Sequence, residues 1–576
     1  MKILIKGVGE KTIDTRRDFV AKGGEGTIYA QSNTAFKIYE DPKKMIPVAK
    51  IQELAVLDTP NIIKPERLIT NGRTIIGHTM RFVTNTVALC QIFTKAFKLR
   101  NNISNDMIVE LVKQFREMIA YIHSKQILVV DLNELNFLVS KKFNSLYAID
   151  VNSYQTPSFP ATAIMEHIRD RHCKLINNLY QFNEGTDWFA WAIVTCQMFL
   201  GIHPYKGGHP KFEKMPVDER LDSRMKANVS IFNDKATVPA ACQAFDVIPP
   251  TLKQWYIAVL EKGWREAPPK DFFAIAAQIV TKIKEIMGSN LFDITEIAKF
   301  QQDILDVWSC GGLRLVLTTD KAFLNNKEVS VTKGSVIGFS PKMNRPVAAY
   351  LDGESIKLFD ISNQKDISFT CNATALMTSG HRLYAQAGTS VLEIKLVDIG
   401  NNIIATADKV GNILDIAGAA HVFDGVILQN LLGKWYASLF PSSGQCYQIK
   451  LDELDSHEIV EAFYENYVLI IVAIHRKTGK YDRFVFRFDE NFATHDYRKI
   501  ENVTYLGLNV AVGDQGICLL IDESEKLETF TNKVNSGVQV LGDPVIASDM
   551  KLYHEDNKML FIKGNKLYSI TKKKKS

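Results

Sequence analysis

The spacing of apolar residues changes near residue 305, and this change divides the chain into two unlike halves. Before it, apolar side chains recur at helical intervals, as in residues 106–124, and these segments alternate with strand-like ones. After it, helical spacing gives way to short β-rich runs separated by Asp-Gly, Ser-Gly and Lys-Gly-Asn turns. A chain of 576 residues with two such patterns is too long to fold around a single hydrophobic core, so we expect two large modules.

The second half, residues 308–571, is predicted to form an all-β domain. A turn glycine followed by an apolar strand recurs at irregular spacing, at Gly353, Gly388, Gly444 and Gly564. So many short strands are best buried by radial repetition, and blades of about 40–45 residues predict a β-propeller of about six blades. The alternative is a β-sandwich that only stabilises the first half.

A glycine-rich segment lies between two predicted strands of the first half. Gly23, Gly24 and Gly26 let backbone amides approach phosphate oxygens, although a tight hairpin is the commoner reason for such a cluster. Lys37 follows inside a short strand, with Ala35 and Ile38 around it. A lysine there is usually solvent-facing, but after a glycine-rich hairpin it is placed to reach phosphates.

Two aspartates and an asparagine end apolar segments further along. Asp131 follows four apolar residues, Asn136 comes five positions later, and Asp150 ends the next apolar strand. Two carboxylates and an amide that converge at strand ends can hold Mg²⁺ and orient a hydroxyl group. Either aspartate alone would more often be a turn or capping residue, but the joint order and spacing favour a phosphate-transfer site.

These residues together resemble the protein kinase family. Asp131-x4-Asn136 followed by Asp150 is similar to its catalytic loop and metal-binding aspartate. The glycine-rich segment is similar to its nucleotide-binding loop, and Ala-Phe-Lys37 to its Val-Ala-Ile-Lys strand. The resemblance extends over about residues 12–285 and is nearer to bacterial and phage Ser/Thr kinase-like proteins than to eukaryotic ones.

A third motif adds to the resemblance. Asp187-Trp-Phe-Ala-Trp-Ala, followed by Gly201-Ile-His-Pro204, looks like the large buried helix of the kinase C-lobe. In such a helix Asp187 would brace the catalytic loop from below.

The resemblance implies an α+β bilobal kinase-like domain ahead of the all-β domain, with ATP and Mg²⁺ as cofactors. The expected organisation is an N-lobe at 1–83, a C-lobe at 84–287, a linker helix or boundary at 288–307, the β-propeller-like domain at 308–571 and a basic tail at 572–576.

The resemblance also implies roles for individual residues. Asp131 would accept or orient the proton of the substrate hydroxyl, Lys37 would hold the α- and β-phosphates, and Glu53 would pair with Lys37. Asn136 and Asp150 would bind Mg²⁺. The nucleotide would contact Gly23, Gly24, Gly26, Ile28, Ala35, Lys37, Met80, Val83 and Leu138, with residues 80–83 as the hinge.

Several positions depart from the family pattern. Val129 and Val130 stand where His-Arg precedes the catalytic aspartate, so a phosphorylated activation loop lacks its usual anchor. Asn133 stands where Ser/Thr kinases have a lysine, and Asp-Val-Asn at 150–152 replaces Asp-Phe-Gly. No Ala-Pro-Glu precedes Asp187 at the expected place.

The leading hypothesis is an ATP- and Mg²⁺-dependent protein kinase that transfers phosphate to Ser/Thr hydroxyls, its own among the candidates. Its β-rich domain would recruit a protein partner or substrate. One alternative is a catalytically weak pseudokinase–propeller scaffold that binds rather than catalyses, which the departures favour. The other is a phosphotransferase for a small molecule.

Composition places the chain among folded proteins of a reducing cytoplasm. Hydrophobic residues make up 46% and charged residues 23%, and the eight cysteines form no Cys-x-x-Cys pair. Lys6 interrupts the apolar start, which argues against a signal peptide, and the apolar run 467–474 is far too short to span a bilayer. The lysines at 572–575 are expected to be a solvated end, so we expect neither a membrane nor a nucleic-acid partner.

Overall fold

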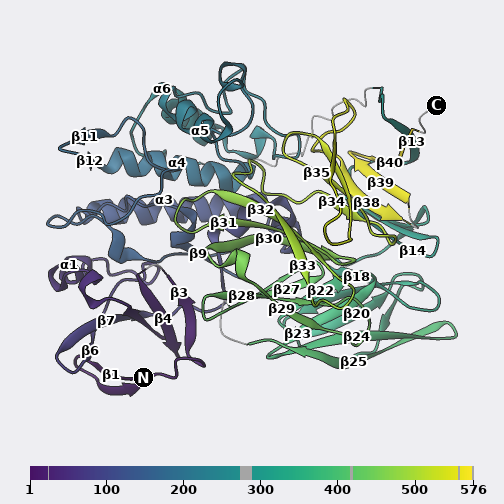
Figure 1. The fold of residues 1–576 in the computed structure, drawn as a ribbon, viewed down its shortest axis with the longest axis horizontal. Helices are drawn as coiled ribbons and strands as arrows, with labels where there is room; N and C mark the ends of the chain where they lie inside the picture. Colours follow the sequence, from purple (N-terminus) through teal and green to yellow (C-terminus); the bar gives the residue numbers. More distant parts are fainter. Residues whose placement is uncertain (24, 273–287, 415–418, 556–557, 574–576) are drawn as a thin grey trace.

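The computed structural model describes residues 1–23, 25–272, 288–414, 419–555 and 558–573. A two-lobed α+β region and an all-β region lie side by side (Figure 1). The expected fold class, a bilobal kinase-like region followed by an all-β region built of propeller-like sheets, is confirmed.

The first lobe is built on a seven-stranded antiparallel sheet in the order β2-β1-β6-β7-β5-β4-β3. Its apolar core includes Ile3, Ile5, Phe36 and Ile69, because alternate residues of each strand face the same side. The strands are β1 (Lys2–Ile5), β2 (Gly9–Thr12), β3 (Phe19–Lys22), β4 (Gly26–Gln31), β5 (Thr34–Tyr39), β6 (Leu68–Asn71) and β7 (Thr74–Arg81), with helix α1 (Val48–Leu54) between β5 and β6.

The second lobe is mainly helical, and its central helix is α4 (Glu184–Leu200). Every residue from Gly185 to Leu200 is buried, as the apolar sequence predicts. Among the described residues, no helix is both long and apolar enough to cross a membrane. The other helices are α2 (Lys95–Arg100), α3 (Asn105–Ser124), α5 (Val217–Lys226) and α6 (Pro250–Lys262), and the strands are β8 (Thr86–Ala88), β9 (Phe137–Ser140), β10 (Leu146–Ala148), β11 (Lys174–Ile176) and β12 (Leu179–Gln181).

Short 3-10 helices occur in both regions of the chain. Two of them carry residues of the predicted catalytic and metal-binding segments, η3 (Glu134–Asn136) and η4 (Val151–Ser153). The others are η1 (Pro42–Lys44), η2 (Leu89–Phe93), η5 (Pro210–Phe212), η6 (Phe245–Val247) and η7 (Asp452–Leu454).

The all-β region contains seven four-stranded antiparallel sheets within the described residues. Six follow one another along the chain. The first three are β14 (Ile304–Cys310), β15 (Leu313–Thr318), β16 (Ala322–Leu324) and β17 (Lys327–Val329); β18 (Val336–Phe339), β19 (Pro346–Asp352), β20 (Ser355–Asp360) and β21 (Lys365–Ile367); and β22 (Ala375–Ser379), β23 (Arg382–Ala387), β24 (Ser390–Ile399) and β25 (Asn402–Asn412). The next three are β26 (Ala420–Phe423), β27 (Val426–Leu431), β28 (Lys434–Leu439) and β29 (Tyr447–Leu451); β30 (His457–Glu465), β31 (Val468–His475), β32 (Tyr481–Phe488) and β33 (His495–Ile500); and β34 (Val510–Val512), β35 (Ile517–Ile521), β36 (Leu527–Thr531) and β37 (Gln539–Leu541).

The seventh sheet joins the two ends of the region, in the order β13-β40-β39-β38. Its first strand comes from the start of the region and pairs with the last, so the ring of sheets is closed by strand pairing. The strands are β13 (Phe292–Lys299), β38 (Lys551–Glu555), β39 (Lys558–Lys563) and β40 (Lys566–Lys572).

This closing sheet corrects two expectations. Residues 292–299 form a strand, so the linker helix expected at 288–307 is wrong, and the described region has seven sheets rather than about six. A β-bulge between Glu296 and Ala298 shifts the register of β13, and this breaks the alternation by which a strand is recognised in a sequence.

The two regions share one apolar core. Phe93 and Leu132 of the helical lobe belong to the same buried cluster as Val472, Tyr481 and Leu506 of the all-β region. The β-rich region is therefore packed onto the helical lobe by buried apolar surface as well as by polar contacts.

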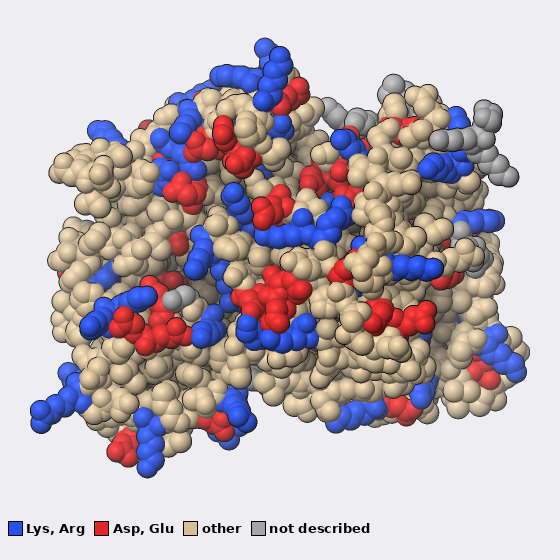
Figure 2. All heavy atoms as spheres, viewed as in Figure 1, with Lys and Arg blue, Asp and Glu red and all other residues tan. Residues whose placement is uncertain are grey.

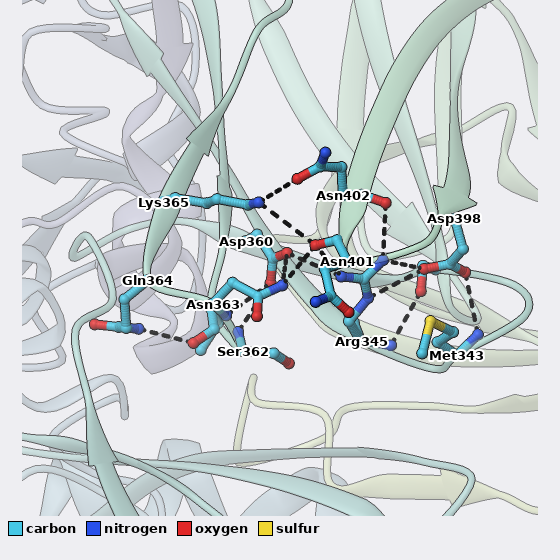
Figure 3. Close-up of polar contacts among 12 residues, drawn as sticks. Met343, Arg345, Asp360, Ser362, Asn363, Gln364, Lys365, Asp398, Asn401 and Asn402 are labelled. Atoms are coloured by element: carbon cyan, nitrogen blue, oxygen red, sulfur yellow. Dashed lines mark hydrogen bonds and ion pairs between the residues drawn. The ribbon is translucent and has the colours of Figure 1, made fainter.

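Neighbouring sheets of the β-rich region are tied by buried ion pairs as well as apolar contacts. The clearest case is Arg345, whose guanidinium lies between Asp360 of the second sheet and Asp398 of the third (Figure 3). It donates to Asp398 at 2.6 Å and 3.1 Å, to Asp360 at 3.4 Å, and to the backbone carbonyls of Asn401 and Asn402 at 3.0 Å. Arginine's planar fork suits such a buried junction, because each N–H finds an acceptor.

Candidate functional site

Lys37 of β5 lies at the centre of a cluster of oxygen atoms. Its Nζ is 2.9 Å from Asp150 Oδ1, 3.2 Å from Asn152 Oδ1 and 3.2 Å from Glu25 Oε2. Burial alone would lower the pKa of Lys37, but the Asp150 and Glu25 carboxylates outweigh it and raise that pKa above its ordinary value. The site therefore contains a permanent cation facing two carboxylates, of which the Asp150 side chain is 43% exposed.

Two residues of the site have left-handed backbone conformations. Val130, next to Asp131, has φ of 62°, and Asp150 has φ of 56°. A β-branched residue rarely adopts this conformation, so Val130 stores strain that its surroundings must offset.

Asp187 at the start of α4 holds this strained loop. Its carboxylate accepts hydrogen bonds from the backbone N–H of Val129 at 2.8 Å and of Val130 at 2.9 Å, and its Oδ2 lies 2.9 Å from His123 Nε2. Asp187 is fully buried. As expected, Asp187 holds the backbone of the loop that leads into Asp131.

Asp131 and Asn136 lie together beside Met165, which belongs to residues 153–186, the segment that corresponds to the activation segment in the kinase resemblance. Asn136 Nδ2 donates to the Asp131 carbonyl at 2.9 Å, and the backbone N–H of Met165 donates to Asp131 Oδ1 at 2.8 Å. Asp131 is 6% exposed, and burial raises its pKa above the ordinary range, partly offset by hydrogen bonds from Asn133 and Met165.

The donor set fits Mg²⁺ held together with a nucleotide. The amide nitrogen of Asn136 is engaged with Asp131, which leaves its oxygen as the ligand atom, and Asp150 supplies an exposed carboxylate. Among the described residues, no group of three or more His, Cys, Asp or Glu side chains could hold a metal alone. Mg²⁺ typically takes one or two protein ligands and completes its shell with phosphates and water, so this sparse set suits it.

Glu53 does not form the expected pair with Lys37. Its Oε2 instead accepts a hydrogen bond from the backbone N–H of Ser158 at 3.2 Å, and hydrogen bonds from Thr156 and Ser158 lower the pKa of Glu53. The carboxylate that joins Asp150 on Lys37 is Glu25 of the glycine-rich segment.

The register of α1 explains this difference. Helix α1 presents Lys50 to the interior, where it is 1% exposed and its Nζ lies 3.3 Å from the carbonyl oxygen of Pro160. Burial lowers the pKa of Lys50 to about 8, and the nearby Glu25, Asp150 and Glu53 carboxylates oppose this shift. Glu53 is directed at the activation segment.

The glycine-rich segment has a packing role as well as its expected one. A Cβ on Gly26 would lie 2.3 Å from the carbonyl oxygen of Ile38, so the β4–β5 pairing itself requires glycine there. Gly23 closes the hairpin by donating its N–H to the Gly26 carbonyl at 2.9 Å. Gly24 lies outside the described residues.

Residues expected to contact the nucleotide lie on neighbouring elements of both lobes. Ile28 pairs with Lys37 across β4 and β5, and Ala35 pairs with Met80 across β5 and β7. Val83 follows β7 in the connection between the lobes, and Leu138 lies in β9 of the second lobe.

Sequence reasoning missed a buried carboxylate between Asp131 and Asn136. Glu134, two positions before Asn136, is fully buried. His167 Nε2 lies 3.0 Å from its Oε2, and the Tyr481 hydroxyl donates to its Oε1. Burial alone would raise the pKa of Glu134, but His167 and Tyr481 outweigh it and hold that pKa below the ordinary value. Tyr481 belongs to the β-rich region, so no local pattern could have connected it with Glu134.

No protein-family model matches the chain, and no curated protein sequence matches it. Among solved structures, the chain is similar to the kinase PK-1 of the Cydia pomonella granulovirus, at 12% sequence identity. The match covers 42% of this chain and 88% of that chain, with a TM-score of 0.31.

Proposed function

We propose that the chain is an ATP- and Mg²⁺-dependent protein kinase that transfers the γ-phosphate to Ser/Thr hydroxyls, its own included. The observation that carries the proposal is the Lys37–Asp150 pair at 2.9 Å, formed between β5 and the segment that follows β10. The pair joins one cation and one metal-ligand carboxylate across the two lobes, beside the loop that carries Asp131 and Asn136.

In this proposal the chain's own residues position the reactants and neutralise charge. Lys37 binds the α- and β-phosphates, while Asn136 and Asp150 offer oxygens to Mg²⁺, which when bound neutralises phosphate charge. Asp131 orients the hydroxyl and accepts its proton, and a carboxylate whose pKa is raised by burial accepts a proton more readily. Catalysis is then mainly electrostatic and positional.

Glu25 gives the site a further property. Its carboxylate contacts Lys37 where the phosphates should bind, so an incoming nucleotide must displace it. Phosphate then replaces the Glu25 carboxylate as the anion on Lys37. Because the Glu25 side chain is 44% exposed, releasing it to water costs little electrostatic energy.

The β-rich region would recruit the protein partner or substrate, and we place the activity in the cytoplasm because the eight cysteines are scattered singly along the sequence with no Cys-x-x-Cys motif. On the face drawn in Figure 2, basic and acidic side chains are interspersed over both regions. That face offers no broad cationic surface of the kind nucleic acid requires.

The test is transfer of label from γ-labelled ATP, with Mg²⁺, to the purified full chain or to an added protein. Asp131→Asn and Lys37→Met should abolish transfer, whereas the exposed matched controls Asp58→Asn and Lys44→Met should leave it unchanged. Wild-type transfer no greater than that of Asp131→Asn would refute the proposal.

The second candidate is a pseudokinase scaffold. The unformed Lys37–Glu53 pair and the Met165 N–H bound to Asp131 favour it. ATP binding without transfer, lost in Lys37→Met, would identify this alternative.

A further inference from the structure

A turn of the β-rich region reaches the catalytic loop. The turn joins β31 to β32, and its residues contact three parts of the kinase-like region. Arg476 donates to the carbonyl of Lys22 in β3 at 3.1 Å, and Tyr481, the first residue of β32, donates to Glu134, which lies between Asp131 and Asn136. Between them, Gly479 lies against the activation segment at His167.

The contact at Gly479 leaves no room for a side chain. A Cβ there would lie 2.1 Å from His167 Nδ1 and 3.0 Å from Met165 Sδ. Gly479 also has φ of 63°, a conformation that suits glycine. The turn is thus shaped for close approach to residues 165–167, the segment whose Met165 N–H binds Asp131.

The Glu134 carboxylate depends on both regions for its hydrogen bonds. Its Oε2 is bound by His167 and its Oε1 by Tyr481. A fully buried carboxylate needs a partner for each oxygen, because it has lost its water. Without Tyr481, one oxygen in the catalytic segment would be left unpaired in the interior.

Polar contacts away from the turn also join the two regions. Lys206 Nζ donates to the carbonyl of Val503 at 2.9 Å, and Glu461 of β30 accepts from Thr94 at 3.0 Å and from Arg100 at 2.8 Å. Together with the shared apolar core, these contacts form a broad interface between the two regions, and the turn is one part of it.

We propose that Tyr481 is a positioning residue of the phosphotransfer site, so that the β-rich region completes this site as well as recruiting partners. Tyr481 holds Glu134, Glu134 holds His167, and the segment from Met165 to His167 is thereby kept over Asp131. This inference rests on the proposed kinase function for its catalytic consequence, but its geometric part can be tested without activity.

The experiment compares Tyr481→Phe with Tyr553→Phe in the full chain. Phenylalanine keeps the ring and removes only the hydroxyl, and the buried Tyr553 hydroxyl has no hydrogen-bond partner among the described residues. In Tyr481→Phe we expect kcat to fall about tenfold or more, with KM for ATP changed less than about twofold, because Lys37 and the nucleotide contacts are untouched. Tyr553→Phe should match the wild type in both.

Two further measurements separate positioning from general destabilisation. Hydrogen exchange over residues 163–168 should be faster in Tyr481→Phe and unchanged in Tyr553→Phe. A double-mutant cycle combines Tyr481→Phe with Glu134→Gln. The double variant should lose much less kcat than the sum of the two single losses, since both substitutions remove the same Tyr481–Glu134 contact.

The outcomes distinguish the two proposals. If the wild type transfers phosphate but Tyr481→Phe retains its kcat, the inference is wrong and the kinase function stands. If the wild type transfers nothing above Asp131→Asn, the kinase function falls, and the exchange measurement alone decides whether Tyr481 holds the segment. Unchanged exchange in Tyr481→Phe overturns the inference in either case.

Discussion

Asp187 gives the sharpest test of how the catalytic loop is held. The substitution Asp187→Asn keeps the shape of the side chain but replaces one acceptor oxygen by an amide donor. Because the carboxylate accepts hydrogen bonds from Val129 and Val130 on different oxygens, the asparagine can serve only one of these two backbone N–H groups.

The expected loss follows from that geometry. A buried backbone donor without a partner costs about 1–3 kcal/mol. The left-handed conformation of Val130 stores strain of about the same size, and the hydrogen bonds to Asp187 help to offset it. When one of these bonds is lost, release of the strain lowers the free energy of opening the loop further. A change of 1–3 kcal/mol corresponds to about a 5- to 150-fold increase in the opening equilibrium constant.

Hydrogen exchange at the amides of Val129 and Val130 measures this opening directly. In Asp187→Asn, their protection should fall by about 5- to 150-fold, while amides in the middle of α4 keep theirs. The matched control is Glu184→Gln on the first turn of the same helix, whose side chain is 64% exposed. Phosphate transfer should fall with the protection, because Asp131 follows this loop directly.

Equal protection of Val129 and Val130 in Asp187→Asn and Glu184→Gln would refute the reasoning. It would mean that the loop keeps its conformation without the carboxylate, and that packing alone offsets the strain at Val130.

Two further predictions follow from single side chains. Glu25→Gln should tighten ATP binding by up to about fivefold in calorimetry, because the phosphates no longer displace a carboxylate from Lys37; weaker binding would contradict it. Burial lowers the pKa of Lys98 to about 7, so between pH 7 and about 10 the unfolded chain binds a proton that the folded chain does not, and stability rises with pH in that window. Lys98→Met should flatten the rise in unfolding temperature from pH 7 to pH 9. An unchanged slope would contradict the lowered pKa of Lys98.

Elements with a strong internal pattern could be predicted from the sequence. Helix α4 is apolar all round and lies buried on all sides, with Asp187 at the base of the catalytic loop. The kinase resemblance implies that Lys37 and Asp150 belong to one nucleotide site, and Lys37 Nζ lies 2.9 Å from Asp150 Oδ1. In both cases the signal comes from short local motifs, each contained in its own segment.

Elements decided by packing between segments could not be predicted in this way. Glu53 and Glu25 are both carboxylates close to the strand of Lys37, and the choice between them depends on the register of α1, which buries Lys50 and turns Glu53 outward. The bulge in strand β13 breaks its alternating sequence pattern, so the strand is recognised from its pairing with β40.

The contact between Tyr481 and Glu134 shows what a sequence can still reveal about such cases. The two residues are 347 positions apart, and Tyr481 reads only as a strand residue. Glu134, however, stands in a segment whose neighbours, Leu132 and Asn136, are buried. A carboxylate in such a place must find donors, and the kinase-like half supplies His167 on Oε2. In this structure that second donor is Tyr481, so the hydrogen bond joins the β-rich region to the segment in which we propose that Asp131 and Asn136 act.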